Sequence, residues 1–314
     1  MIRKGCVVLG VTCGCLVASA LGTRAAELPP WQRVGTGITG GVSGMAVVEG
    51  APVSRDRADV VVVRDNKEEG QDRVVTVRLR PGEEPVTTAL RWKGPLPEDL
   101  EALDAVPGRR DHYIAVASEG VAYHIVVTGD TATVQDKPVP LPGRASGDNY
   151  ESFALFRHPS GRSFAVWATR GKSEEKSVMR AAPVKTDEKS LRIGRPAATR
   201  QFAVPFPNED EVRHVSDLKV LPDGTLLVSS ASDPNRDDGP FSSAVYSAGK
   251  LSVNRRHQPV LHLEKRGHLA PLRLFTKQDD RKIEAVVHLP DEQEIWGTDD
   301  EHHGGFVRFD RVRP

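Results

Sequence analysis

Tyr150-Glu151-Ser152-Phe153-Ala154-Leu155 is the most informative stretch of this 314-residue sequence, because four other segments share its pattern. In each of them a polar residue precedes a short run of small, mostly apolar residues, and the run ends at a turn. A second apolar run and a polar loop follow each turn. The other segments are Val42-Ser43-Gly44-Met45-Ala46-Val47, Leu100-Glu101-Ala102-Leu103-Asp104-Ala105, Ser216-Asp217-Leu218-Lys219-Val220-Leu221 and Ile283-Glu284-Ala285-Val286-Val287.

The polar residues of these segments, at positions 43, 101, 151, 217 and 284, recur roughly every 50–70 residues. A four-stranded propeller blade needs roughly 40–50 residues, so each unit has room for one blade and its loops. The repeat therefore predicts a β-propeller with four-stranded antiparallel blades around a central channel. Five blades are expected, and six are the alternative.

The rest of the chain agrees with an all-β fold. Short β-branched or aromatic runs, such as residues 60–63 and 164–168, are separated by turns rich in Gly and Pro. Helical periodicity is nearly absent, which leaves all-β as the class that fits.

The first 22 residues resemble a secretion signal. Arg3 and Lys4 form a basic start, and residues 5–22 carry no charge. We expect a signal peptide over residues 1–22, with a cut possible up to residue 26, and one propeller domain over residues 23–314. An uncleaved anchor, or a lipid anchor on Cys15, is the alternative. The expected location is therefore outside the cytoplasm, secreted or periplasmic, with no membrane span after signal removal.

Composition narrows the function further. All three cysteines lie within residues 1–22, so no disulfide is expected in the mature domain. The chain has 43 basic and 43 acidic residues, which gives no electrostatic reason to expect nucleic-acid binding. The nucleophile-elbow, P-loop and dinucleotide-binding patterns are absent. We expect a monomer whose partner is a small anionic substrate or another protein.

The predicted geometry brings two sets of polar residues together. The residue that opens the first strand of each blade should lie at the mouth of the channel. The loops between second and third strands should lie at the same end, because the chain reverses at each turn. These loops include residues 64–67, 169–172, 232–238 and 298–303.

Several carboxylates at one narrow entrance repel one another, so some must bind a proton or a cation. Ca²⁺ prefers oxygen ligands, which makes it the predicted metal. The alternative is that each carboxylate accepts backbone hydrogen bonds and holds one blade to the next. The candidate metal ligands are Glu101, Glu151, Asp217, Glu284, Asp233, Asp299 and Asp300.

The segments around Glu101, Glu151, Asp217 and Glu284 resemble the blade starts of secreted phytase-like propellers, a family described as esterase-like. In the first unit, Ser43 stands where this pattern has an acid. The resemblance implies a site at the channel mouth in which metal ions hold a phosphate ester and activate water.

The first functional hypothesis is therefore a calcium-dependent phosphate-ester hydrolase, with no catalytic residue assigned. Four basic side chains near the mouth are the candidate ligands for the anionic substrate. They are Arg170, Lys172, Arg213 and His214. The alternative hypothesis is a non-catalytic propeller that binds a ligand or a protein at the same mouth.

Overall fold

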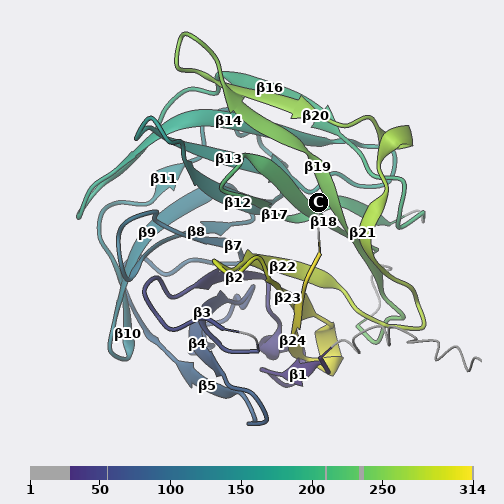
Figure 1. Ribbon diagram of the computed structural model, residues 1–314. Coiled ribbons are helices and arrows are strands. Elements are labelled where there is room, and N and C mark those ends of the chain that lie inside the picture. The colour runs from purple at the N-terminus through teal and green to yellow at the C-terminus, as the bar shows by residue number, and fades with distance from the viewer. Residues whose placement is uncertain (1–28, 55, 209–210, 233–236, 313–314) are drawn as a thin grey trace, which may run out of the picture.

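The computed structural model describes residues 29–54, 56–208, 211–232 and 237–312. Within these residues five small sheets surround a common axis, so the predicted all-β propeller with five blades is confirmed (Figure 1). The predicted signal peptide and its cleavage site lie outside the described residues. Among the described residues, no helix is long and apolar enough to cross a membrane.

Each blade begins with the strand nearest the axis. Blade 1 has the order β2 (Gly44–Val47), β3 (Ala58–Val63), β4 (Val74–Leu79) and β5 (Val86–Ala89). Blade 2 has the order β7 (Leu100–Ala105), β8 (His112–Ala117), β9 (Val121–Thr128), β10 (Thr131–Val134) and β6 (Arg91–Lys93), with β11 (Val139–Pro140) paired to β9. Blade 3 has the order β12 (Tyr150–Arg157), β13 (Ser163–Thr169), β14 (Ser177–Thr186) and β15 (Leu191–Ile193), with β16 (Ala198–Phe202) paired to β14.

Blade 4 has the order β17 (Val212–Val220), β18 (Thr225–Ser232), β19 (Ser242–Val253) and β20 (Pro259–Leu263), with β21 (Pro271–Phe275) paired to β19. Blade 5 has the order β22 (Ile283–His288), β23 (Glu294–Asp299), β24 (Gly305–Asp310) and β1 (Gln32–Arg33). The short 3₁₀ helices are η1 (Ile38–Gly40), η2 (Arg266–His268) and η3 (Glu301–His303).

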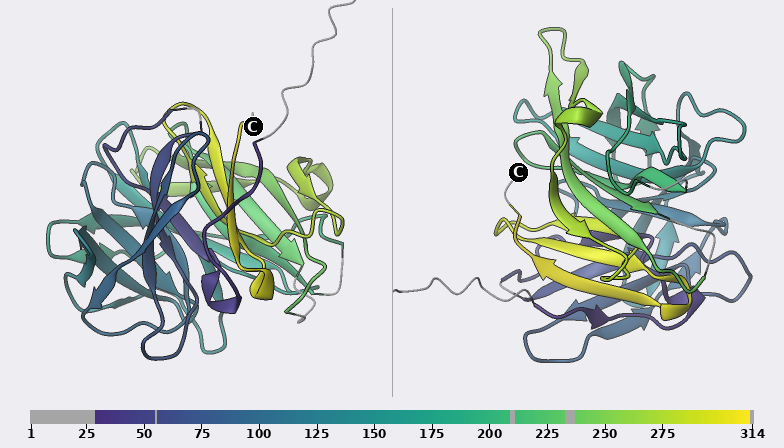
Figure 2. Two further views of the ribbon diagram at one scale, coloured as in Figure 1. Left: turned by 90° about the horizontal axis from the view of Figure 1, so that it is seen from below. Right: turned by 90° about the vertical axis from the view of Figure 1, so that its right-hand side faces the viewer.

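The N-terminal strand closes the ring. β1 pairs antiparallel with β24 and so becomes the outermost strand of the blade that the C-terminal segment builds (Figures 1 and 2). Trp31 continues this contact: the guanidiniums of Arg281 and Arg308 lie 5.4 and 4.5 Å from its ring centre. Such cation–π contacts add to the strand pairing. The ends of the described chain are therefore held in one blade.

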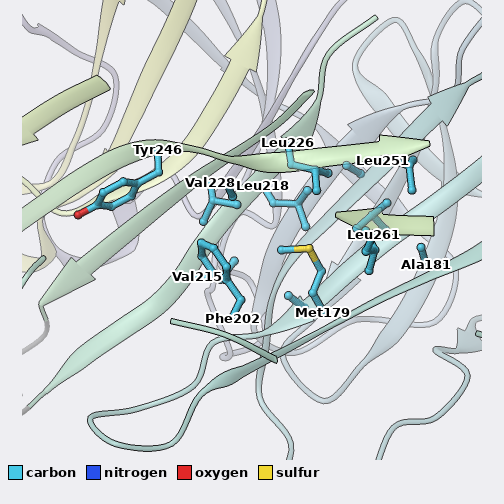
Figure 3. Close-up of a cluster of buried hydrophobic side chains, with 14 of the residues drawn as sticks. Met179, Ala181, Phe202, Val215, Leu218, Leu226, Val228, Tyr246, Leu251 and Leu261 are labelled. Carbon is cyan, nitrogen blue, oxygen red and sulfur yellow. The ribbon is translucent and has the colours of Figure 1, made fainter. Parts of the chain in front are cut away.

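The hydrophobic core is divided among the blade interfaces. Of the five buried apolar clusters in the described residues, one lies between each pair of neighbouring blades. The cluster between blades 3 and 4 packs Phe202, Val215, Leu218 and Tyr246 together (Figure 3). Side chains from both blades are needed to exclude water, so the blades stabilise one another by hydrophobic burial.

The strands nearest the axis approach one another closely. A Cβ added to Gly44 on β2 would lie 2.8 Å from the backbone nitrogen of Leu103 on β7, so glycine is required there. Ala102, Ala154 and Ala285, which the sequence placed on these strands, are fully buried. Small side chains therefore allow the five inner strands to surround a narrow channel.

Candidate functional site

The structure brings polar residues from several blades together at one end of the channel. In blade 1 the loop after β3 returns to the start of the blade, where the Asp65 N–H donates to Ser43 Oγ at 3.2 Å. In blade 3 the loop after β13 brings Arg170 Nη1 within 3.4 Å of Glu151 Oε1. We call this end of the channel the mouth.

Backbone bulges direct three of the predicted acids to the mouth. Glu101, Glu151 and Glu284 each sit where one extra residue interrupts the pairing of an inner strand with its neighbour. A bulged residue leaves the regular ladder, and its side chain can be turned toward the axis. The pairing shifts between Leu100 and Ala102, between Tyr150 and Ser152, and between Ile283 and Ala285.

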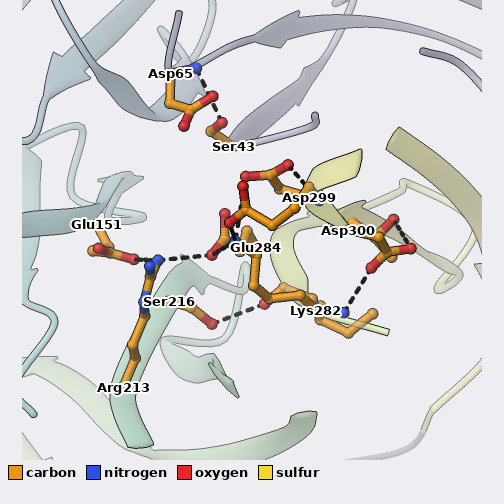
Figure 4. A network of polar contacts seen from close by, with 12 residues as sticks. Ser43, Asp65, Glu151, Arg213, Ser216, Lys282, Glu284, Asp299 and Asp300 are labelled. Atoms are coloured by element: carbon orange, nitrogen blue, oxygen red, sulfur yellow. Dashed lines mark hydrogen bonds and ion pairs between the residues drawn. The ribbon is translucent and has the colours of Figure 1, made fainter. Parts of the chain in front are cut away.

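Blade 4 differs, because β17 begins at Val212 and the predicted start at Asp217 lies in the middle of the strand. Arg213 therefore takes the mouth position of this blade. Its Nη1 lies 3.0 Å from Glu151 Oε2 and 2.8 Å from Glu284 Oε1, so one guanidinium joins the acids of two blades (Figure 4).

Lys282 supplies a second cation that the sequence analysis did not select. It is 1% exposed, and its Nζ lies 3.4 Å from Glu284 Oε1, 3.4 Å from Asp299 Oδ2 and in contact with Glu301 (Figure 4). Burial alone would lower the pKa of Lys282, but the charges of Asp299, Glu284 and Glu301 together raise it well above its usual value. The ammonium is therefore a permanent positive charge at the mouth.

Glu101 has a different environment from Glu151 and Glu284. It is 8% exposed and makes no hydrogen bond or ion pair with any other residue in the described part of the chain. Burial, followed by the charges of Glu151 and Asp65, raises the pKa of Glu101 well above its usual value. Glu101 therefore holds its proton more tightly than an ordinary glutamate, as a group that donates a proton must.

Asp65 is a second carboxyl group with an altered pKa. Burial, the nearby charge of Asp299 and, to a smaller extent, that of Asp99 raise its pKa to about 7, against the lowering effect of Lys282. The group therefore exchanges its proton close to neutral pH. Its loop, residues 64–67, was predicted to lie at the mouth, but Asp65 itself was not singled out.

Two other predicted site residues, Asp217 and Asp300, accept hydrogen bonds that stabilise the fold. The Asp217 carboxylate accepts the Leu218 and Val286 N–H groups, each at 2.7 Å, so it links blade 4 to blade 5 as the structural alternative expected. Asp300 accepts the Lys282 N–H at 2.8 Å and an Arg281 N–H at 2.7 Å. Both carboxylates are thus occupied by partners within the fold.

His214 and Lys172 do not join the acids at the mouth. His214 is buried, with Nε2 2.9 Å from the Ser173 carbonyl and Nδ1 accepting the Val204 N–H at 3.4 Å. Lys172 Nζ pairs with Glu211 Oε2 at 2.6 Å. Among the four predicted substrate ligands, Arg170 and Arg213 are therefore the two that contact the mouth acids.

The calcium prediction is not tested by this geometry. The described residues contain no group of three or more His, Cys, Asp or Glu side chains placed to hold a metal ion. Asp233, one of the predicted ligands, lies outside the described residues. Glu151 and Glu284 instead share the guanidinium of Arg213.

Comparison with known proteins identifies the fold. No protein-family model matches the sequence, and no curated protein is significantly similar to it. A thermostable family-43 glycoside hydrolase has a TM-score of 0.51 at 12% identity, over 91% of this chain and 93% of that one. A second glycoside hydrolase has a TM-score of 0.51 at 9% identity, over 90% of this chain and 64% of that one.

A structure of an α-L-arabinofuranosidase from Podospora anserina, in complex with cellotriose, has a TM-score of 0.47 at 11% identity, over 91% of this chain and 98% of that one. Likeness at these identities shows the fold alone. The chain is a five-blade β-propeller similar to those of glycoside hydrolases.

Proposed function

We propose that this protein is a hydrolase that cleaves a glycosidic bond in an uncharged saccharide at the mouth of the channel. Glu101 carries the proposal, because a buried carboxyl group without a partner in the described residues is suited to hold a proton at neutral pH. Cleavage of a glycosidic bond requires such an acid to protonate the leaving oxygen, and a second carboxylate to complete the reaction.

Asp65 is the proposed general base. Its pKa of about 7 leaves part of the protein with a deprotonated Asp65 at neutral pH, while the pKa of Glu101 is raised well above its usual value. A base works best when its pKa lies near the working pH. The two carboxyl groups therefore have the different protonation states that hydrolysis by acid and base requires.

The charges at the mouth favour an uncharged substrate. Arg213 is held by two glutamates, and Lys282 is held by Glu284, Asp299 and Glu301. Asp65, in the deprotonated form that a general base requires, would repel the oxygens of a phosphate group. A neutral sugar, whose hydroxyls both donate and accept hydrogen bonds, avoids this repulsion.

The test is a screen of nitrophenyl glycosides and neutral polysaccharides, with Glu101→Gln compared against wild type. Loss of a general acid lowers the rate by roughly 10²–10⁴-fold. Glu264→Gln is the matched control, because Glu264 is an exposed glutamate that follows β20, at the outer edge of blade 4. Absence of hydrolysis across the screen, or equal rates for Glu101→Gln and wild type, would contradict the proposal.

The second candidate is the calcium-dependent phosphate-ester hydrolase. The observation that favours it is the crowding of Glu101, Asp65 and Glu284, whose pKa values are all raised, because a divalent cation would relieve their repulsion. No step is assigned to calcium, since the described donor groups do not form a ligand set.

A calcium titration of phytate and phosphodiester hydrolysis tests this candidate on the same protein. Calcium-dependent release of phosphate without glycoside cleavage would replace the first proposal by the second. If neither substrate class is cleaved, and a saccharide or a protein still binds at the mouth, the non-catalytic alternative holds.

A further inference from the structure

A cavity of about 350 Å³ lies at the end of the channel opposite the mouth. All five inner strands line it with residues near their last positions, whereas the mouth is built from their first positions. Most of these side chains are apolar. One from each inner strand is Val47, Ala105, Leu155, Val220 and Val287.

An ion pair within the channel forms part of the cavity wall. Lys219 of β17 is 6% exposed, and its Nζ donates to the Leu103 carbonyl of β7 at 2.6 Å. The same Nζ lies 3.6 Å from Asp104 Oδ1. Because Lys219 and Asp104 neutralise each other, they add polarity to the cavity without a net charge.

Two further charged groups line the cavity without satisfied partners. Glu49 Oε1 accepts the Gly108 N–H at 3.2 Å, but Glu49 Oε2 is buried and has no hydrogen-bond partner in the described part of the protein. Arg157 makes no hydrogen bond or ion pair with any residue that the structure describes. Arg157 Nη1 also lies against Gly108, because a Cβ added to that glycine would come within 2.7 Å of the Arg157 nitrogen.

The cavity therefore offers a carboxylate oxygen and a guanidinium on either side of one turn, next to an apolar wall. Glu49 Oε2 is buried and unpaired, which is costly, and a ligand that donates to it recovers that free energy. Arg157 is exposed, and it attracts a carboxylate by its charge and its N–H groups. A simple anion would face the repulsion of Glu49, and a simple cation would face that of Arg157. A ligand that carries both charges can place its anionic group beside Arg157 and its cationic group beside Glu49, and so avoids both repulsions.

We propose that this cavity binds a small zwitterion with an apolar side chain, of the class of a free α-amino acid. Arg157 pairs with the ligand carboxylate, and Glu49 accepts from its ammonium group. Leu155, Val220 and Val287 contact the side chain. A volume of about 350 Å³ lies at the lower end of the range for small-molecule pockets, as such a ligand requires.

The test uses calorimetric titration of the whole protein with three probes of similar shape: L-leucine, 4-methylpentanoate and 3-methylbutylamine. The second lacks the ammonium group and the third lacks the carboxylate. L-Leucine is expected to bind with a Kd in the millimolar range or below, and each analogue about tenfold more weakly.

Arg157→Met and Glu49→Gln are each expected to weaken leucine binding about tenfold. Arg200→Met, which removes an exposed arginine from β16, is expected to leave it unchanged. Thermal melting of each variant checks that the fold is intact. The proposal is overturned if leucine does not bind, if all three probes bind equally, or if neither cavity substitution changes the leucine affinity. Glycoside hydrolysis at the opposite end has no part in these outcomes.

Discussion

Replacement of Asp217 by asparagine should destabilise the protein at acid pH and stabilise it at alkaline pH. Asp217 is fully buried, and burial raises its pKa to about 7 from an ordinary value of 3.8, although Lys219 and two backbone N–H groups oppose the shift. A carboxyl group with a raised pKa stabilises the folded state below its unfolded pKa, and this stability is lost as pH rises through the folded pKa.

The size of the effect follows from the shift. About three pKa units at 1.36 kcal/mol each correspond to ~4 kcal/mol of folding free energy lost by the wild type between pH 4 and pH 8. The introduced asparagine would not titrate. Its amide offers one oxygen for the Leu218 and Val286 N–H groups, and an unsatisfied buried group costs about 1–3 kcal/mol at every pH.

Asp217→Asn should therefore be less stable than wild type at pH 4 by about 1–3 kcal/mol, and more stable at pH 8 by a similar amount. Urea unfolding at both pH values measures the difference. Asp223→Asn is the contrasting control: hydrogen bonds from Thr225 lower the pKa of Asp223, so this variant should lose stability at neutral pH and approach wild type in acid. Equal destabilisation of Asp217→Asn at pH 4 and pH 8 would refute the reasoning.

Three further predictions concern the mouth. Arg213→Met should destabilise the protein by about 3–5 kcal/mol at pH 7, because Glu151 and Glu284 lose their shared cation; urea unfolding beside wild type measures the loss. For glycoside hydrolysis, kcat/KM should rise through about pH 7 as Asp65 loses its proton, and Asp65→Asn should remove that rise and lower the rate roughly 100-fold. If the mouth binds Ca²⁺, as the second candidate requires, a hundredfold excess over Kd should stabilise the protein by about 2.7 kcal/mol, and Glu151→Gln with Glu284→Gln should abolish that response; a melting temperature indifferent to calcium and chelator removes the metal site.

The fold could be predicted from the sequence because each blade must begin the same way. A small residue has to face the crowded axis, and a turn has to follow, so residues such as Ala102, Ala154 and Ala285 mark three of the blade starts. The polar residue that precedes the small residues also marks the start of an inner strand. This is why the repeat pattern was enough to place Glu101 and Glu284 at the start of their inner strands.

Blade 4 was misaligned because its inner strand is longer at the start. β17 begins at Val212, and its pairing with β18 is irregular between Arg213 and Asp217, so the pattern of small residues points to the middle of the strand and not to its start. Lys282 was missed for another reason. A lysine before an apolar run is usually a surface residue, and only the ring of blades shows that three acids surround this one.

The sequence predicted that some carboxyl groups at the mouth would bind a proton or a cation, but it could not show which ones, because each pKa depends on burial and on charges from other blades. Glu101 and Glu151 occupy equivalent positions in the repeat. Glu151 nevertheless contacts Arg170 and Arg213, while Glu101 contacts neither. The proposed difference in role therefore comes from residues that the repeat pattern does not include.

The protonation state of Glu101 tests the proposed chemistry most directly. The measurement is a ¹³C NMR titration of the glutamate side-chain carboxyl groups, with the Glu101 signal assigned by its loss in Glu101→Gln. The account predicts a neutral carboxyl at pH 7 that ionises only at higher pH. A Glu101 signal that titrates at the ordinary glutamate value of 4.5 would contradict it.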